Sequence, residues 1–153
     1  MRYRLVFTIA ILFLTACKKD KFTTAPQIEY KSISPTAVTA GTNSSDPVVT
    51  IHITDSEGDL GITTKDTAFV YMKSLLTNNF DSIAFPDLQA VTKSKFSADV
   101  DITLSKVFKC KTLPGNPPPL HTDQIYFEIY VKDFAKNKSN VIRTGEPVYF
   151  TCR

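Results

Sequence analysis

Apolar and polar residues alternate along most of the chain after residue 26. The alternation is clearest at 95–104 and 123–133, where apolar residues occupy every second position. A period of two is typical of a β-strand with one face in the core and the other toward solvent. The same pattern, or a short apolar run, predicts further strands at 27–34, 47–54, 67–74, 81–85 and 146–152. Because no window keeps an apolar period of 3.6, we expect no helix longer than a single turn.

This series of short strands predicts an all-β fold. About seven strands, separated by Pro, Asn and Gly, fit into little more than a hundred residues. Such spacing favours an antiparallel β-sandwich of immunoglobulin-like type, with a small barrel as the alternative. The chain has no Trp and lacks the cysteine pair between strands that marks antibody domains, so the expected likeness is one of architecture.

The start of the chain is an export signal rather than part of the fold. A basic leader precedes an apolar run at 5–14, which ends in Leu-Thr-Ala before Cys17. Two lysines follow Cys17, well short of the ~20 apolar residues that a membrane span requires. The tetrapeptide at 14–17 is similar to the lipobox of bacterial lipoproteins, whose cysteine becomes the acylated N-terminus. An ordinary cleavage site with a chance cysteine is the alternative.

The expected domain organisation follows from this signal. Residues 1–16 would be removed, residues 17–26 would form a polar tether from a lipidated Cys17, and 27–153 would form a single domain. The chain has 18 Lys and Arg against 15 Asp and Glu, and two of the arginines lie in the leader. The mature chain is therefore nearly neutral and lacks the basic excess of a nucleic-acid-binding protein.

The other two cysteines form an even pair in an exported chain. Counting by twos from the apolar residues just before them reaches Cys110 and Cys152, so both sulfurs are expected to point inward. A bridge between them would hold the last strand and contribute about 3–4 kcal/mol by closing a long loop. Two independent buried thiols are the alternative.

An acidic loop at 53–62, ITDSEGDLGI, is the main candidate for chemistry. Counting by twos along the strand before it places Asp55 in the inward phase, and the same count along 123–133 does so for Asp133. In an immunoglobulin-like sandwich these two strands end at the same pole in opposite sheets, so the two carboxylates would face each other. Glu57, Asp59 and Asn137 complete a set of oxygen ligands that suits a structural Ca²⁺. A solvated turn with acidic residues is the alternative.

Several segments together resemble small uncharacterised lipoproteins of Bacteroidetes. These carry an acidic loop of the form D-G-D-G-D-L-G and a later turn of the form D-x-A-G-N-x-S-N. The matches to the two motifs are Asp55, Gly58, Asp59, Leu60 and Gly61, then Asp133, Ala135, Asn137, Ser139 and Asn140. Ser56, Glu57 and Lys136 depart from the family pattern, and Lys136 would strain the turn if its φ is positive. The resemblance implies an immunoglobulin-like lipoprotein and carries no established activity. By analogy, Lys18 after the lipidated cysteine favours the outer membrane.

The remaining polar candidates have weaker patterns. Neither His52 nor His121 has a nucleophile motif beside it, so a catalytic triad or a zinc site is not expected. Asp99 and Asp101 share the outward face of a strand and could act as paired carboxylates, although a charged solvent face is the simpler reading. Tyr126 and Tyr130 also share an outward face and are candidates for contact with a partner.

Two functions fit these patterns. The first is a membrane-anchored envelope lipoprotein that acts as a non-enzymatic binding or accessory module for a protein or glycan partner, without a catalytic residue. The second is a hydrolase or carbohydrate-active enzyme that uses Asp99 and Asp101, or the acidic pole. A concave site with perturbed carboxyl groups would distinguish the second from the first.

Overall fold

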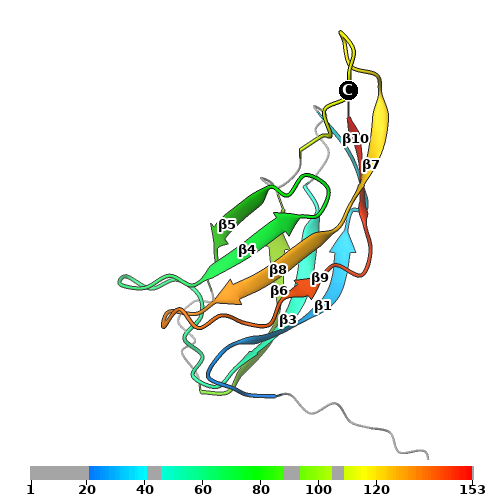
Figure 1. Cartoon of the computed structure of the whole chain (residues 1–153). Helices are drawn as coiled ribbons and strands as arrows, with labels where there is room; N and C mark the ends of the chain where they lie inside the picture. Colours follow the sequence, from blue (N-terminus) through cyan, green and yellow to red (C-terminus); the bar gives the residue numbers. More distant parts are fainter. Residues whose placement is uncertain (1–20, 41–45, 88–93, 105–108, 153) are drawn as a thin grey trace, which may run out of the picture.

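The computed structural model describes residues 21–40, 46–87, 94–104 and 109–152. In these ranges the chain forms ten strands and no helix. Figure 1 shows how the strands are arranged. The strands are β1 (Gln27–Ser34), β2 (Ala37–Thr39), β3 (Val48–Asp55), β4 (Phe69–Ser74), β5 (Phe80–Ala84), β6 (Phe96–Thr103), β7 (His121–Ile125), β8 (Phe127–Lys132), β9 (Ile142–Arg143) and β10 (Val148–Cys152). The all-β prediction is confirmed. Over the same ranges, no helix has the length and apolar character that crossing a membrane requires.

Three sheets build the sandwich. One has the order β1-β3-β6, another β5-β4-β8-β9, and a third β2-β10-β7. All pairs of these strands are antiparallel except that β2 runs parallel to β10. The expected number of about seven strands was too low because β2 and β9 are only three and two residues long, and because 123–133 forms two strands, β7 and β8. The sequences of β2 and β9 are too short to reveal a period.

The stretch predicted as one strand at 123–133 is instead two strands in two sheets. The alternation continues through the break, so Ile125 and Phe127 are both fully buried. The pairing partner changes at Tyr126: β7 pairs with β10, whereas β8 pairs with β4 and β9. The sequence period reports which face a residue occupies, and it contains no information on which strand lies alongside.

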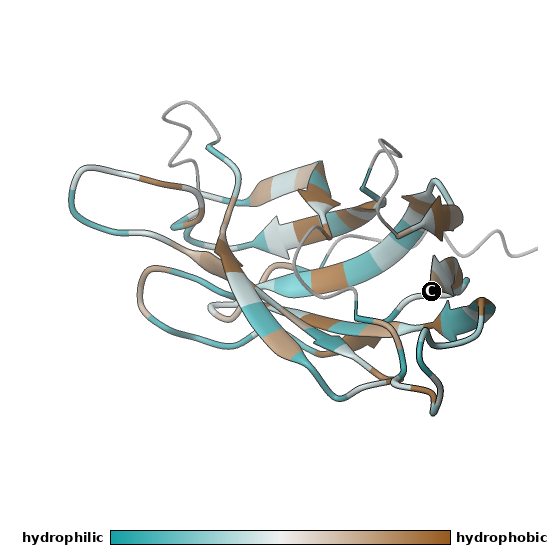
Figure 2. Ribbon diagram, turned by 90° about the horizontal axis from the view of Figure 1, so that it is seen from above, coloured by the Kyte–Doolittle hydropathy of each residue, from teal (hydrophilic) through white to brown (hydrophobic). Residues whose placement is uncertain are grey.

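Side chains from facing sheets fill the core between them. Val49, Ile51 and Ile53 of β3 and Ile129 and Val131 of β8 have no exposed surface. Brown and teal bands alternate along the strands in Figure 2, as expected for strands with one buried face. Every buried hydrophobic residue in the described ranges lies between Ile28 and Cys152, so the chain from Lys21 onward carries this core.

The predicted disulfide is present between Cys110 and Cys152. The Sγ atoms are 2.09 Å apart, and the bridge joins β10 to the segment after residue 108. Cys110 lies outside the strands, and the residues before it, 105–108, lie outside the described ranges. The bridge therefore ties the last strand to a connection 42 residues earlier in the chain.

Candidate metal centre

The acidic loop begins where β3 ends. Asp55 is the last residue of β3, and its Oδ2 accepts a hydrogen bond from the backbone N–H of Gly58. Gly58 and Gly61 have φ angles of 67° and 94°, which are left-handed values that glycine adopts without steric cost. The N–H of Ser56 donates to the carbonyl of Thr23 at 3.1 Å, so the segment before β1 supports the loop. The sequence thus folds into a tight turn around a carboxylate.

The second loop begins where β8 ends. Asp133 accepts two hydrogen bonds from Asn137, from the backbone N–H at 2.8 Å and from the side-chain Nδ2 at 2.9 Å. Lys136 has a φ of 68°, in the left-handed region that is strained for a residue with a side chain. The predicted strain at this position is therefore present. The Asp133 carboxylate fixes this turn much as Asp55 fixes the first.

Asp59 joins the two loops. Its carbonyl accepts a hydrogen bond from the N–H of Phe134 at 3.0 Å, and its Oδ2 accepts one from the N–H of Ala135 at 3.3 Å. β3 and β8 belong to different sheets, and the loops that follow them meet at one pole of the sandwich, as Figure 1 shows. The expected meeting of the two loops is therefore seen, and Asp59 is the residue that makes the contact.

Asp55, Asp59 and Asp133 place buried carboxylate oxygens at this pole, and two of these oxygens are not satisfied. Asp55 and Asp133 have no exposed surface. The Oδ1 atoms of Asp55 and Asp59 are buried and have no hydrogen-bond partner among the described residues. Burial, and to a lesser degree the charge of Asp59, raise the pKa of Asp55 to about 6. Burial and the charge of Asp133 likewise raise the pKa of Asp59. Ionised carboxylates here would repel one another unless a proton or a cation intervened.

The oxygen atoms are close enough to share one cation. Asp55, Glu57 and Asp59 each offer a carboxylate oxygen, and these three atoms lie within 4.8 Å of one another. Two oxygens on one Ca²⁺, each at 2.3–2.6 Å, can be at most about 5 Å apart. Glu57 is exposed and so could turn toward a shared cation, whereas Asp55 is buried at the end of β3. This donor set contains oxygen only, which suits Ca²⁺ better than a transition metal.

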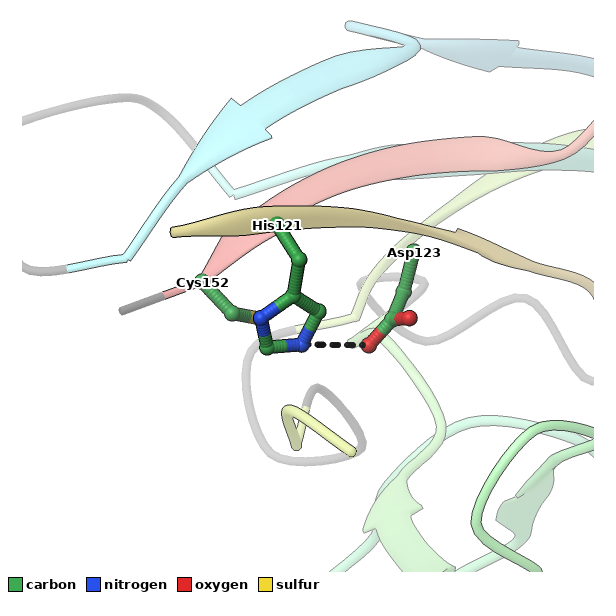
Figure 3. Close-up of side chains that lie close together, drawn as sticks. All are labelled: His121, Asp123 and Cys152. Atoms are coloured by element: carbon green, nitrogen blue, oxygen red, sulfur yellow. Dashed lines mark ion pairs between the residues drawn. The ribbon is translucent and has the colours of Figure 1, made fainter. Parts of the chain in front are cut away.

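A second cluster, shown in Figure 3, does not offer a free metal site. Nε2 of His121 lies 3.4 Å from Oδ2 of Asp123, and both residues lie near Cys152. The Sγ of Cys152 is bonded to Cys110, so it is not available as a thiolate ligand. Oδ2 of Asp123 also accepts a hydrogen bond from the N–H of Lys111 at 3.1 Å. The cluster therefore stabilises the connection around the disulfide.

Three hydrogen-bonded side chains on the outer face of the β1-β3-β6 sheet resemble a catalytic triad. Nδ1 of His52 is 2.6 Å from Oδ1 of Asp99, and its Nε2 is 3.3 Å from Oγ of Ser97. This arrangement is not evident from the sequence, because it arises from the register that pairs His52 of β3 with Asp99 of β6. The Asp99 side chain is 59% exposed, unlike the buried aspartate of a serine hydrolase. Asp101 accepts a hydrogen bond from Thr50 at 2.7 Å.

The two tyrosines proposed for partner binding do not form one unit. Tyr130 stacks on Tyr71 of β4, with ring centroids 4.7 Å apart. Tyr126 instead lies beneath Arg143, whose guanidinium carbon is 4.2 Å from the ring centroid. Cys17, the proposed lipid site, lies outside the described residues.

Comparison with protein-family models, with curated proteins and with solved structures gives no match.

Proposed function

We propose that this chain is a membrane-anchored lipoprotein of the cell envelope, held at the outer membrane by acyl chains on Cys17. Its domain acts as a non-enzymatic binding or accessory module, and a structural Ca²⁺ at the acidic pole fixes the loops after β3 and β8. The proposed ligands are Asp55, Glu57 and Asp59, whose carboxylate oxygens lie within 4.8 Å of one another, and Asp133 and Asn137 are further candidates from the loop after β8. Protein and glycan are the candidate classes of partner.

The Asp55 carboxylate carries the calcium proposal. It is fully buried, one oxygen is held by Gly58, and the other has no hydrogen-bond partner among the described residues. A buried carboxylate in this state is unfavourable unless it is protonated or bound to a cation. Asp59 presents a second oxygen without a partner beside it. A cation would satisfy both oxygens at once and would bridge the loops that Asp59 joins.

An immunoglobulin-like topology is part of this proposal. The order β1-β3-β6 opposite β5-β4-β8-β9 follows the A-B-E and C′-C-F-G strands of that fold. In that fold the loops at one end of the sandwich form the binding surface of many modules. Fixing the loops with an ion would therefore prepare a surface at the pole for a partner.

Thermal unfolding of the chain from Lys21 onward tests the calcium part of the proposal. A ligand that binds only the native state at a hundred times its Kd stabilises by about 2.7 kcal/mol. We therefore expect millimolar Ca²⁺ to raise the Tm by roughly 10 °C relative to EGTA. Asp55→Asn and Asp59→Asn should abolish this rise, and Asp99→Asn, a matched change on the outer sheet face, should keep it. An equal Tm in Ca²⁺ and EGTA would contradict the proposal.

Membrane attachment is tested separately by expressing the full chain in a bacterium with a lipoprotein pathway. The wild-type chain should fractionate with the outer membrane and incorporate labelled palmitate, because two acyl chains are needed for stable anchoring. Cys17→Ser should lose both properties. Palmitate incorporation into Cys17→Ser would contradict the assignment of the anchor.

The second candidate function is hydrolysis. It is favoured by the hydrogen-bonded arrangement of Ser97, His52 and Asp99. Ser97 would be the nucleophile and His52 its base, with Asp99 orienting the ring. An alternative use of the same face pairs Asp99 with Asp101 as acid and base. A fluorophosphonate should then label the wild-type chain but not Ser97→Ala. Glycosidase activity that is lost in Asp99→Asn, together with a wild-type chain that the fluorophosphonate does not label, would favour the paired carboxylates.

A further inference from the structure

Aromatic side chains gather on the outward face of the β5-β4-β8-β9 sheet. Tyr71 stacks with Tyr130 at 4.7 Å and with Phe80 at 5.9 Å between ring centroids. Phe69 extends the group, with its centroid 6.4 Å from that of Tyr71. Phe80 is 56% exposed, which is unusual for a phenylalanine in a protein of this size. We name these four residues the aromatic face.

Basic side chains cover the aromatic face. The Nζ atoms of Lys132, Lys136 and Lys138 lie 5.4, 5.9 and 4.1 Å from the ring centroids of Tyr71, Phe69 and Tyr130. Each distance is within the range of a cation–π contact. The outward positions of the four strands include one carboxylate, Glu128, which pairs in register with Lys73 and Arg143. The face therefore combines exposed apolar rings with a net positive charge.

The outer face of the opposite sheet has a different character. There Asp99 and Asp101 of β6 lie on the solvent side, with Glu29 of β1 in register with His52. The two outer faces of one nearly neutral domain thus differ in charge. The positive charge of the aromatic face is a local property and does not reflect an excess of lysine over the whole surface.

The ring geometry limits what can bind. Tyr71 and Tyr130 are nearly parallel, with an interplanar angle of 7°, so each covers one face of the other. Lys138 lies over Tyr130, so a flat ligand cannot stack on that ring without displacing the ammonium group. The rings therefore present edges and hydroxyl groups between ammonium groups, and Phe80 supplies the accessible apolar surface. This pattern suits a ligand with alternating C–H surface, hydroxyl groups and negative charges.

We propose that the aromatic face binds a carboxylated polysaccharide. The uronate carboxylates would contact Lys132 and Lys138, and the C–H face of a sugar ring would pack on Phe80. An acidic peptide that adds to the sheet as a strand would pair along the edge strand β5, whereas Lys132 of β8 and Lys138, which bridges to it, lie two strands away. This inference rests on the proposed non-enzymatic module and specifies its partner, but it does not depend on the calcium ion.

Binding of the chain from Lys21 onward to sodium hyaluronate, neutral dextran and poly-glutamate tests the proposal. Binding is measured by fluorescence anisotropy of end-labelled polymers at low ionic strength, in EGTA and in Ca²⁺. We expect binding to hyaluronate, no binding to dextran and weaker binding to poly-glutamate. Lys138→Glu and Phe80→Ser should each weaken binding to hyaluronate at least tenfold. Lys31→Glu makes the same charge change at an exposed residue of β1 in another sheet, and it should leave the binding of hyaluronate unchanged.

Each outcome has a defined meaning. No binding to hyaluronate would overturn the proposal, and so would an equal loss in Lys31→Glu, because that loss would indicate unspecific charge attraction. Binding of poly-glutamate as tight as that of hyaluronate would assign the face to an acidic protein instead. If hyaluronate does not bind while Ca²⁺ still raises the Tm, the calcium-stabilised module stands and this inference alone fails. Retention of far-UV circular dichroism in the variants shows that they are folded.

Discussion

Asp55→Asn is the substitution whose effect the structure defines most fully. The change keeps the shape of a fully buried side chain and removes its ability to ionise. In the wild-type chain, burial raises the pKa of this carboxyl to about 6 from its ordinary value of 3.8. Each pKa unit corresponds to 1.36 kcal/mol, so ionisation in the folded state is opposed by about 3 kcal/mol.

The sign of the pH dependence follows from this shift. Between about pH 4 and 6 the native state holds a proton that the unfolded state has lost, so stability falls as pH rises through this window. The raised pKa of Asp59 acts in the same direction. Without calcium, the wild-type chain should therefore lose about 3 kcal/mol of unfolding free energy between about pH 4 and 7. If Ca²⁺ binds the carboxylate form as proposed, it should remove most of this loss.

Urea unfolding from about pH 4 to 8, in EGTA and in millimolar Ca²⁺, measures the effect. In EGTA the Asp55→Asn variant should be more stable than the wild-type chain above about pH 6, and its own pH profile should be flatter. In Ca²⁺ the order should reverse, since the variant lacks the ligand. If the wild-type chain in EGTA instead gains stability as pH rises while Asp55→Asn does not, the Asp55 carboxylate is favourably ionised and the reasoning is refuted.

Four further changes test other parts of the fold by urea unfolding. Lys136→Gly relieves a φ of 68° and should stabilise by about 0.5–1 kcal/mol, and a loss of stability would show that the Lys136 side chain matters more than the backbone strain. Replacing Cys110 and Cys152 by Ser opens a loop of 42 residues and should cost about 4 kcal/mol, and an unchanged midpoint would contradict a constraining role. Asn140→Ala removes the side chain that binds both the N–H and the carbonyl of Ile28, and it should lower the free energy of unfolding by about 1–3 kcal/mol. Asn137→Ala should also lower it and, in addition, should remove the stabilisation by Ca²⁺.

The alternation of apolar and polar residues was sufficient to predict the buried residues of the core strands and the pole at which the candidate metal site lies. Val49, Ile51 and Ile53 are buried as their alternation predicts, because a strand has only two faces. Extending the same count put Asp55 and Asp133 inside the rim, and both are buried. Strand ends and buried faces are local consequences of the residue order.

Contacts between strands could not be predicted in this way. The His52–Asp99 pair and the Tyr71–Tyr130 stack depend on the register of β3 with β6 and of β4 with β8. Asp59 was one of four acidic residues proposed at the pole, and its role in joining the loops depends on the position of the Ala135 backbone. Register is set by the whole sandwich, and a single strand's sequence does not contain it.

Nuclear magnetic resonance of the ¹⁵N-labelled chain from Lys21 onward, titrated with Ca²⁺ at neutral pH, tests the calcium site most directly. The account predicts amide shifts that saturate at one ion per chain and are concentrated at 55–61 and 133–137, including the N–H groups of Gly58 and Ala135 that bind the two carboxylates. Asp55→Asn should remove these shifts. Shifts that never saturate, or that fall mainly on β6 beside Asp99 and Asp101, would contradict a calcium site at this pole.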